Sequence, residues 1–542
     1  MTSRVLQVSV LAHDKDGNPV TNLGQGDFTI YDNGHPQPIQ YFNIISGTLP
    51  SAPHLDIPPG FFTNDPARNA GVPANVVIIL VDALNTPYNE QVYANHQLWA
   101  YLRKLKPVDH VAIYTLGEKL QILQDFTTDD AALIKAAEAY QGQRVVQQDA
   151  ANPNGSVLTA KGDSTTNPVP YGNPMGVPRM NGVIYEDLLR IRHMDESIEV
   201  SYTVNRVDTT LNALRAIAAH VAGIPGRKNL IWLSGGFPLA IGTDAISERQ
   251  PDEHPTDVVV RFDAMERTLR ALDDANVAVY PVDTRGLIAP DLQSPRYLQQ
   301  SGGGPTGSRD ISDTLMTMDH VAESTGGKAY YNTNGIERSL TRASDDAATS
   351  YVLGYSLATT DGKFHKLKVA VDRKGVSIRA RQGYFAIPAA PYSFDQQYDL
   401  VQDAEESPLD WTGLPLIVEA NLTHSAIPEV SISVRIYGNR IRFLPQDQYE
   451  VATIDYAFVQ RDGAGHIVKR TGAVYNLRLD AADYQTAMGK GLVYRLTSAL
   501  DLKAAEVRIV ACDASTGALG SVTIPLAELA ATNPSSRVPA PK

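Results

Sequence analysis

The residues best placed for chemistry follow a short apolar run near the start of the chain. Residues 76–81 read VVIILV, Asp82 comes directly after them, and Thr86 follows four positions later. Such a run is typical of a strand buried in a parallel sheet, and ligands of these sheets bind beyond the carboxyl ends of the strands. Carboxylate and hydroxyl oxygens are the ligands that magnesium, manganese and calcium prefer. The spacing therefore suggests a hard-cation site at Asp82.

Other interpretations of Asp82 stay open. Leu84 stands between the two oxygen-bearing side chains and cannot ligate a metal. Without a metal, Asp82 would cap the following helix or accept hydrogen bonds from backbone N–H groups, with Asn85 and Thr86 closing the turn. An aspartate after an apolar strand also resembles the nucleophile of haloacid-dehalogenase-like phosphate-transfer proteins, but that chemistry needs a second aspartate where Leu84 stands. We therefore expect no enzyme and no catalytic residue.

Length and charge narrow the classes of protein further. A chain of 542 residues is expected to form two to four domains. Its net charge of −13 argues against nucleic acid and anionic membrane surfaces as partners. No stretch of eighteen apolar residues occurs, so we expect no membrane-spanning helix. Cys512 is the single cysteine, which excludes an intrachain disulfide.

The elements that must position Asp82 alternate between strand and helix, which predicts an α/β domain with a doubly wound, mostly parallel sheet. The β-rich segments on either side of this domain are each small for a stable sandwich, so we predict that they pack together as one. The last third shows regularly spaced strands and turns, which predicts a separate β-sandwich. The expected order is a β segment at 1–47, a linker at 48–75, the α/β domain at 76–340 with an insertion at 143–200, a β segment at 348–388, a linker at 389–411, the C-terminal sandwich at 412–530 and a tail at 531–542.

Several stretches, taken in order, resemble a known family. Together they resemble the bacterial VWFA-related proteins first grouped from Acidobacteria, and residues 76–340 resemble a von Willebrand factor type A domain. The resemblance covers about residues 1–388 and is weaker beyond 412. The stretches are DKDGNPVTNLGQGDFTIYDNG at 14–34, ILVDALNT at 79–86, GRKNLIWLSGG at 226–236, VAVYPVDTRGL at 277–287, ESTGGKAYYNTN at 323–334, YVLGYS at 351–356 and RARQGYFA at 379–386.

The resemblance implies a metal site with residues missing. In the family a DxSxS motif, a later threonine and a later aspartate hold a divalent cation. The first aspartate matches Asp82, the first serine matches Leu84, and the second serine matches Thr86. The later threonine matches Thr209 or Thr210, and the later aspartate falls on Gly235. Two of the five ligands are thus lost, and we expect a degenerate site that binds magnesium, manganese or calcium weakly or not at all.

The same resemblance implies a protein partner and an adhesion or scaffold role. A metal-dependent ligand binder, with the cation completed by a partner's carboxylate, stays as an alternative. Asp283 ends another strand, and we expect it to pair with Arg285. Relatives are usually exported, so an extracytoplasmic location is expected, although residues 1–17 carry a strand pattern and no signal-peptide core.

Overall fold

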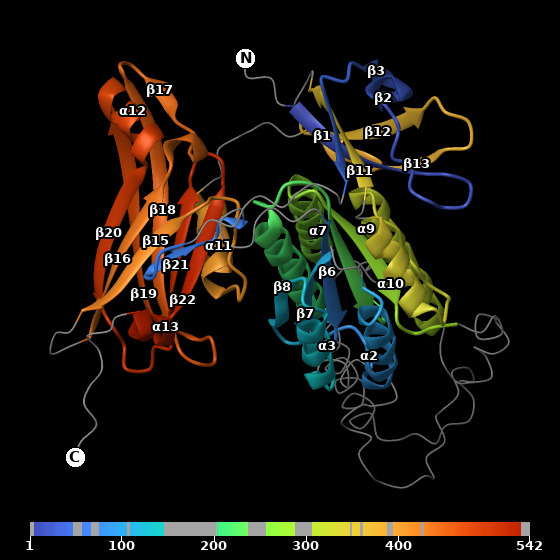
Figure 1. Ribbon diagram of the computed structural model, residues 1–542, viewed down its shortest axis with the longest axis horizontal. Helices are drawn as coiled ribbons and strands as arrows, with labels where there is room; N and C mark the ends of the chain where they lie inside the picture. The colour runs from blue at the N-terminus through green and yellow to red at the C-terminus, as the bar shows by residue number, and fades with distance from the viewer. Residues whose placement is uncertain are drawn as a thin grey trace, which may run out of the picture.

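A computed structural model places most of the chain in three bodies (Figure 1). None of the helices in the described ranges is long and apolar enough to span a membrane. Nearly all of the insertion expected at 143–200, and all but the start of the tail expected at 531–542, lie outside the described residues. The structure describes residues 5–46, 57–66, 75–105, 109–145, 202, 204–236, 256–287, 306–346, 349–357, 361–386, 394–423 and 428–532.

The N-terminal sandwich consists of two four-stranded sheets, β13-β1-β11-β4 and β14-β12-β2-β3. Each sheet combines strands from the segment before the central domain with strands from the segment after it. β1 pairs antiparallel with β11, and β2 pairs antiparallel with β12. Asn33 and Gly34 both have positive φ and form the tight turn between β2 and β3. The strands are β1 (Val5–His13), β2 (Phe28–Asp32), β3 (His35–Gln37), β4 (Tyr41–Ser46), β11 (Thr349–Ser356), β12 (Phe364–Val371), β13 (Ser377–Arg379) and β14 (Gly383–Phe385).

The central domain is built on a five-stranded sheet in the order β10-β9-β6-β7-β8. The first four strands run parallel, and β8 is antiparallel to β7, so the sheet is mixed. Alternate residues of β6 enter two separate apolar cores, one on each face, which explains why the strand is apolar throughout. The strands are β6 (Asn75–Asp82), β7 (Asp109–Leu116), β8 (Leu120–Thr127), β9 (Lys228–Ser234) and β10 (Val277–Asp283).

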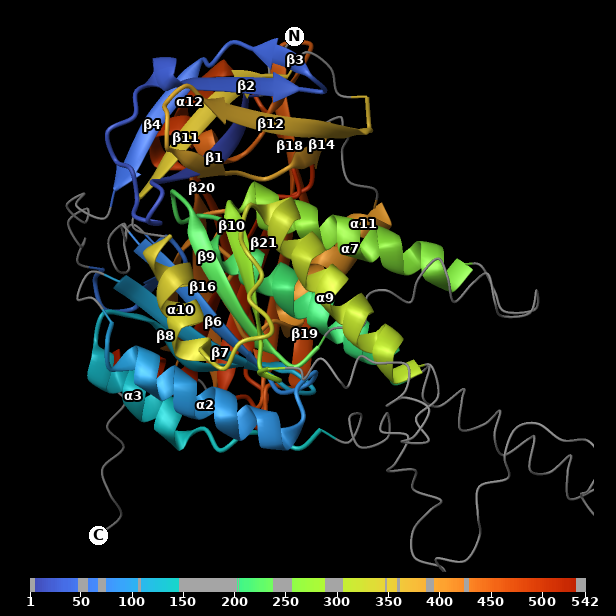
Figure 2. The same cartoon turned by 90° about the vertical axis from the view of Figure 1, so that its right-hand side faces the viewer.

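Helices cover both faces of this sheet (Figure 2). Apolar side chains of α2, α3 and α10 pack on the face that carries Val77 and Ile79. The helix of residues 204–221, together with α7 and α9, packs on the face that carries Ile78 and Leu80. The bounds are α2 (Tyr88–Leu102), α3 (Asp130–Ala139), α7 (Thr256–Asp274), α9 (Thr306–Thr325) and α10 (Ile336–Asp345).

The C-terminal sandwich has one sheet in the order β20-β16-β15-β5 and a second in which β18 pairs with β17, β19 and β21, and β21 with β22. Its core is one apolar cluster between the sheets. The elements are β15 (Ile417–Thr423), β16 (Glu429–Ile436), β17 (Leu444–Gln446), β18 (Tyr449–Arg461), β19 (Ile467–Leu479), α12 (Ala481–Lys490), β20 (Leu492–Ala499), β21 (Glu506–Asp513), β22 (Leu519–Pro525) and α13 (Leu526–Thr532).

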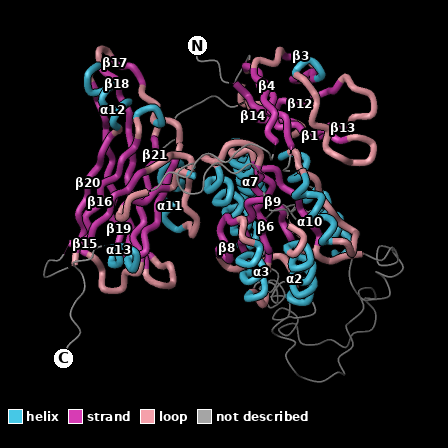
Figure 3. Tube along the Cα trace, viewed as in Figure 1, coloured by secondary structure: helices cyan, strands magenta, loops and turns pink. Residues whose placement is uncertain are grey.

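Both segments expected to be linkers contain regular structure. Within 48–75, β5 (Phe61–Thr63) pairs with β15 and so belongs to the C-terminal sandwich. Three residues are too few to show an alternating pattern, and Pro, Asn and Gly surround them. Within 389–411, α11 (Phe394–Glu406) lies against the outer face of β21 (Figure 3). Most of its residues are polar, and its buried contacts come from Val401 and Ala404, so its apolar stripe is narrow.

Candidate functional site

Asp82 lies at the carboxyl end of β6, where β6 and β9 are neighbours. From β6 the chain continues to β7 on one side, while β9 and β10 lie on the other side. The strand order therefore reverses between β6 and β9, the place where open α/β sheets commonly bind ligands. The Asp82 side chain is only 1% exposed, so what surrounds its carboxylate decides what it can do.

Four donors occupy the Asp82 carboxylate. Oδ1 accepts the backbone N–H of Asn85 at 3.0 Å. Oδ2 accepts the Asn85 side-chain amide, the indole N–H of Trp232 and the hydroxyl of Ser234, each at 2.9 Å. All four donors are neutral, and three of them share one oxygen. The carboxylate is thus a hydrogen-bonded hub that joins the ends of β6 and β9.

Arg206 interacts with this hub through Asn85 and not through the carboxylate itself. Burial raises the pKa of Asp82, and the hydrogen bonds from Asn85, Ser234 and Trp232 oppose that rise without cancelling it. Arg206 donates two hydrogen bonds to Asn85 Oδ1, at 3.1 and 3.2 Å. Burial lowers the pKa of Arg206, while the charge of Asp82 acts to raise it. Asn85 therefore stands between the carboxylate and the guanidinium and bonds to both.

The other predicted ligands divide between two places. Thr86 Oγ1 accepts the backbone N–H of Gly235 at 2.8 Å, which fixes the β9 loop against the β6 loop. Thr210 Oγ1 accepts the Asn85 amide at 2.9 Å and donates to the Arg206 carbonyl at 2.8 Å. Thr209 faces elsewhere and lines a cleft toward the C-terminal sandwich. The structure thus brings Asp82, Thr86 and Thr210 together and leaves Thr209 out.

These residues do not fit a divalent cation. The oxygens of Asp82 are taken by protein donors, and Leu84 is fully buried in the apolar core beneath the site. Among the described residues, no group of three or more His, Cys, Asp or Glu side chains that could hold a metal ion is found. Neutral N–H and O–H groups therefore hold the carboxylate where the family resemblance implies a metal.

Glu90 fills the space next to Gly235. A Cβ at position 235 would lie 2.7 Å from Glu90 Oε2, so the loop needs glycine there while Glu90 keeps this position. Glu90 Oε2 is buried and has no hydrogen-bond partner in the described part of the chain. Burial, together with the charge of Asp283, raises the pKa of Glu90 to about 7, although Arg285 acts to lower it. A carboxylate thus stands near the expected place of the lost aspartate, but it comes from α2.

Asp283 and Arg285 form a closed pair at the end of β10. The Asp283 oxygens accept Arg285 Nε and an Arg285 terminal amine, both at 2.9 Å, and the Arg285 backbone N–H at 2.9 Å. Asp283 itself is fully buried. Its hydrogen bonds with Arg285 satisfy both carboxylate oxygens, so the pair stabilises the loop after β10.

Sequence reasoning missed most of the hub. Asn85 was expected only to close the turn, and Trp232, Ser234 and Arg206 were not singled out. Trp232 is separated from Asp82 by 150 positions in the chain, and only the pairing of β6 with β9 brings them together. The available signal was an indole and a hydroxyl near the end of the otherwise apolar NLIWLS run.

A second candidate site is the cleft between the central domain and the C-terminal sandwich. Its volume is about 930 Å³, near the upper end of the roughly 300–1,000 Å³ of small-molecule pockets. The helix of residues 204–221 and the start of β8 line one side, and the end of α11 and the β18–β19 turn line the other. Arg215 and Asp403 face each other across it at 3.6 Å. Its charged groups thus include an ion pair between its two walls.

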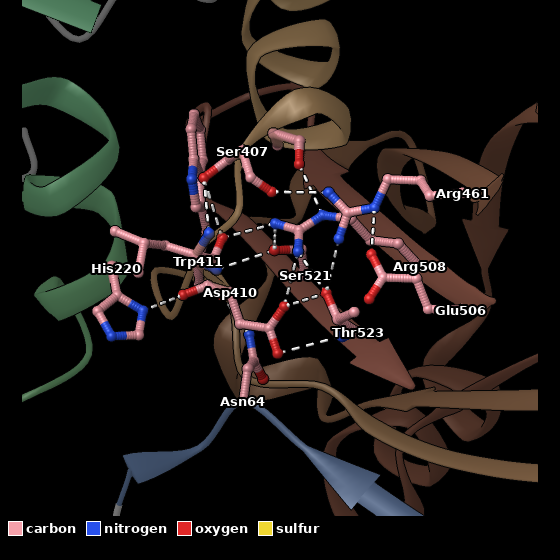
Figure 4. Close-up of polar contacts among 12 residues, drawn as sticks. Asn64, His220, Ser407, Asp410, Trp411, Arg461, Glu506, Arg508, Ser521 and Thr523 are labelled. Carbon is pink, nitrogen blue, oxygen red and sulfur yellow. Dashed lines mark hydrogen bonds and ion pairs between the residues drawn. The ribbon is translucent and has the colours of Figure 1, made fainter. Parts of the chain in front are cut away.

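A buried arginine network holds one wall of this cleft (Figure 4). Arg508, which is fully buried, donates to Asp410 Oδ1 at 2.8 Å, to Ser521 Oγ at 2.7 Å and to the carbonyl of Leu409 at 2.6 Å. Arg461 Nε lies 2.7 Å from a Glu506 carboxylate oxygen. These contacts fix the segment that leads from α11 into β15 against β21 and β22.

The same segment is tied to the central domain (Figure 4). Thr412 donates its hydroxyl to the His220 carbonyl at 2.7 Å and its backbone N–H to the Ala219 carbonyl at 3.1 Å. The His220 ring nitrogen Nδ1 lies 2.5 Å from the carbonyl oxygen of Asp410. The two domains therefore meet through a built, hydrogen-bonded contact beside the cleft.

Comparisons with known proteins give slight likenesses. No family model matches the sequence, and no curated protein matches it. A von Willebrand factor type A structure from Catenulispora acidiphila is similar at a TM-score of 0.22 and 8% identity, covering 68% of this chain and 81% of that one. The pilus adhesin SpaC from Lactobacillus rhamnosus GG, in its open conformation, has a TM-score of 0.26 and 11% identity.

The coverage of these neighbours is uneven. The SpaC match covers 93% of this chain and 57% of the adhesin chain. An aerotolerance-related membrane protein from Bacteroides fragilis has a TM-score of 0.24 and 10% identity, and the match covers 50% of this chain and 98% of that one. Likenesses of this size carry no argument about fold or function.

Proposed function

We propose that this chain is a non-enzymatic protein-interaction protein, with an adhesion or scaffold role, whose central domain presents recognition loops held by the Asp82 hub in place of a cation. The observation that carries the proposal is the occupation of Asp82 by four internal donors. A carboxylate used in this way fixes the loops that follow β6 and β9. Loops held rigidly at the carboxyl end of a sheet are a common place for recognition.

The motif order across 1–388 supports a VWFA-related protein with a degenerate cation site, and through it an exported, extracytoplasmic location. Three contacts fit the degenerate site: Leu84 in the core, Gly235 against Glu90, and Thr86 on a backbone N–H. Exposed aromatic side chains near these loops, Tyr88 at 39% and Tyr93 at 37%, offer contact area for a protein partner.

The alternatives have weaker support from these residues. A phosphate-transfer nucleophile must reach its substrate, whereas Asp82 is buried and its oxygens are already bonded. A metal-dependent binder would need the cation to displace Asn85, Ser234 or Trp232 from the carboxylate. Each displacement would leave a buried donor without a partner, which costs about 1–3 kcal/mol.

The test is site-specific photocrosslinking from the recognition loops. The full chain carries a photoreactive phenylalanine analogue at Tyr88, in cells or extract of its source, and products are identified by mass spectrometry. Leu502, which is 99% exposed on the C-terminal sandwich, carries the analogue in the matched control. We expect a discrete protein product from position 88 that is absent from position 502 and persists in EDTA.

Two results would overturn the proposal. Equal products from both positions would mean that the loops recognise nothing specific. A product from position 88 that disappears in EDTA and returns with magnesium, manganese or calcium would establish the metal-dependent alternative instead.

A further inference from the structure

β19 is an unusually long strand at the edge of its sheet. It spans thirteen residues, Ile467–Leu479, and within the described ranges it pairs with β18 alone. Strands in globular proteins typically have about five or six residues, and natural edge strands are usually short. A long edge offers a row of backbone groups to which another strand can bond.

The register shows which residues of β19 face outward. The carbonyls of Arg461 and Thr453 on β18 accept hydrogen bonds from Ala505 and Ala514, on the β21 side. Odd-numbered residues of β18 therefore point toward β21, and even-numbered ones toward β19. The β19 residues opposite the odd-numbered ones must point away from β18; they are Arg470, Gly472, Val474, Asn476 and Arg478.

These five residues are open to solvent. All five are exposed, and Val474 reaches 60%. In the part of the chain that the structure describes, β19 pairs with β18 alone, and no turn or loop backbone group bonds to the N–H or C=O of these residues. Their side chains lie on the outer face of the sheet, since Arg470 reaches Glu405 of α11 at 2.9 Å. The free edge is thus a run of alternate unpaired amides around an exposed valine.

The core-facing side of the same strand leaves an apolar margin. Tyr475 meets Tyr456 of the neighbouring strand β18 and Tyr494 of β20 in the facing sheet edge to face, at centroid distances of 5.7 and 4.8 Å, and remains 41% exposed. Leu477 packs partly on the sandwich core. An added strand with apolar side chains on this face would pack against the exposed part of Tyr475 and shield it from solvent.

The charge of β19 favours an acidic partner strand over a second copy of β19. β19 contains Lys469, Arg470 and Arg478 and no acidic residue. Arg470 already pairs with Glu405, whereas Arg478 lies over the ring of Tyr449 at 4.1 Å and has no carboxylate partner among the described residues. A second copy of β19, paired antiparallel about Val474, would place Arg470 opposite Arg478 twice. Like charges directly opposite destabilise a pair of strands, so an acidic strand fits better than a second copy.

We propose that the free edge of β19 binds an extended segment of a partner protein as an added antiparallel strand, with a carboxylate opposite Arg478 and an apolar residue opposite Val474. The recognition is of the strand-addition kind, in which backbone hydrogen bonds supply affinity and alternate side chains supply specificity. This surface lies on the C-terminal sandwich and is separate from the recognition loops of the central domain.

The probe is a fluorescein-labelled nonapeptide, Glu-Leu-Thr-Val-Val-Thr-Thr-Val-Thr, whose first residue meets Arg478 and whose fifth meets Val474. Fluorescence anisotropy with the full chain should show saturable binding. Val474→Pro removes one outward N–H and blocks the edge without touching the β18 ladder, and should weaken binding at least about tenfold. Val474→Thr keeps the donor and should bind within roughly twofold of the parent.

A charge exchange tests the register. Arg478→Glu should weaken binding of the glutamate peptide by roughly fivefold, and a peptide with lysine at its first position should recover that loss. A peptide N-methylated at its odd-numbered residues should not bind the unaltered chain, a result that does not depend on any variant folding. Binding to Val474→Pro equal to the parent, or binding of the methylated peptide, would overturn the proposal.

Sedimentation of the chain alone distinguishes the other occupant. A dimer that Val474→Pro abolishes would show that a second copy occupies the edge, and would overturn the proposal. A monomer that binds the peptide supports it. Crosslinking from Tyr88 is independent of this edge, so failure here and failure of the proposed function are separate results.

Discussion

The indole N–H of Trp232 lies 2.9 Å from Oδ2 of Asp82 and joins the ends of two neighbouring parallel strands. Both side chains are buried away from water, so the carboxylate and the indole N–H satisfy each other's need for a hydrogen-bond partner. Burying a charged carboxylate at the rim of a sheet costs free energy, which hydrogen bonds from neutral donors offset. The same hydrogen bonds fix the geometry of the loops that carry the donors.

Replacing Asp82 should destabilise the central domain. Asp82→Ala removes the acceptor of four buried hydrogen bonds donated by Asn85, Trp232 and Ser234, and we expect a loss of roughly 3–5 kcal/mol in the free energy of unfolding. Urea unfolding followed by tryptophan fluorescence measures it. Thr209→Ala, on the neighbouring helix but outside the hub, should change stability by less than about 0.5 kcal/mol. An unchanged Asp82→Ala midpoint together with lost cation binding would contradict the structural role.

Glu90 should make the central domain less stable as the pH rises. Its pKa is raised from 4.5 to about 7, chiefly by burial, so the folded state holds the proton more tightly than the unfolded state. The resulting stability is complete below pH 4.5 and is lost as the pH rises through about 7. Glu90→Gln should therefore be more stable than the parent at pH 8, by about 1 kcal/mol once solvent screening is allowed for.

Unfolding of Glu90→Gln at pH 5 and pH 8 provides the check. The exposed Glu138→Gln is the control and should leave the pH dependence of the parent in place. If Glu90→Gln and the parent changed in parallel between the two pH values, Glu90 would be ionised throughout.

His365 should stabilise the N-terminal sandwich on the acid side. Its Nδ1 lies 2.7 Å from Asp32 and its Nε2 lies 3.2 Å from Asp361. Burial acts to lower the pKa of His365, but the hydrogen bonds and charges of the two aspartates outweigh it and raise the pKa above 6.5. The stability from the protonated ring is therefore complete below pH 6.5 and is lost as the pH rises through the folded-state pKa.

His365→Gln should thus cost about 1 kcal/mol more at pH 6 than at pH 9. Histidine ring resonances, followed by NMR through a pH titration, report the pKa directly. His466→Gln, whose ring is 64% exposed, is the matched control and should behave alike at both pH values. A His365 ring that titrates below its ordinary range would refute the predicted direction.

Arg508→Met should destabilise the C-terminal sandwich by roughly 3–5 kcal/mol, because it removes the donors to the buried carbonyls of Ala404 and Leu409 and takes the cation away from the half-buried Asp410. Differential scanning calorimetry should show a lower transition for this domain. Arg440→Met, at an exposed position, should leave the transition in place. Adding Asp410→Asn to Arg508→Met should recover part of the loss, since the unpaired charge is then gone. A double variant that is simply additive would mean that the two residues do not interact.

Local sequence signals predict parts of the fold, whereas the candidate site depends on residues that are distant in the chain. Continuous apolarity in 76–81 predicted a strand buried on both faces, and Asn33-Gly34 predicted a tight turn, because both signals are local. The cation ligands were matched along the chain, one position at a time. That approach could not show that Glu90, from a helix, takes the space beside Gly235.

The same dependence on distant contacts applies to α11 and β5, which lie within the predicted linkers. α11 buries Val401 and Ala404 against β18 and β21, but its sequence is mostly polar, so tertiary contact and not periodicity defines it. β5 is held by β15 and by side chains such as Asn64, which donates to the Leu414 carbonyl at 3.0 Å. The contacts that define α11 and β5 form only when strands distant in the chain are in place.

The pairing of β5 with β15 also sets an order of events during synthesis. Thr63 donates its hydroxyl to the Leu416 carbonyl, across 353 positions in the chain. Domains generally fold from the N-terminus as they emerge from the ribosome, so β5 must wait unpaired while the whole central domain is made. A truncated product that ends before residue 417 keeps an orphan strand of another domain on its surface, a ready target for quality-control proteases. Conversely, a fragment that begins at residue 412 lacks β5 and exposes the edge of β15 that β5 covers in the whole chain.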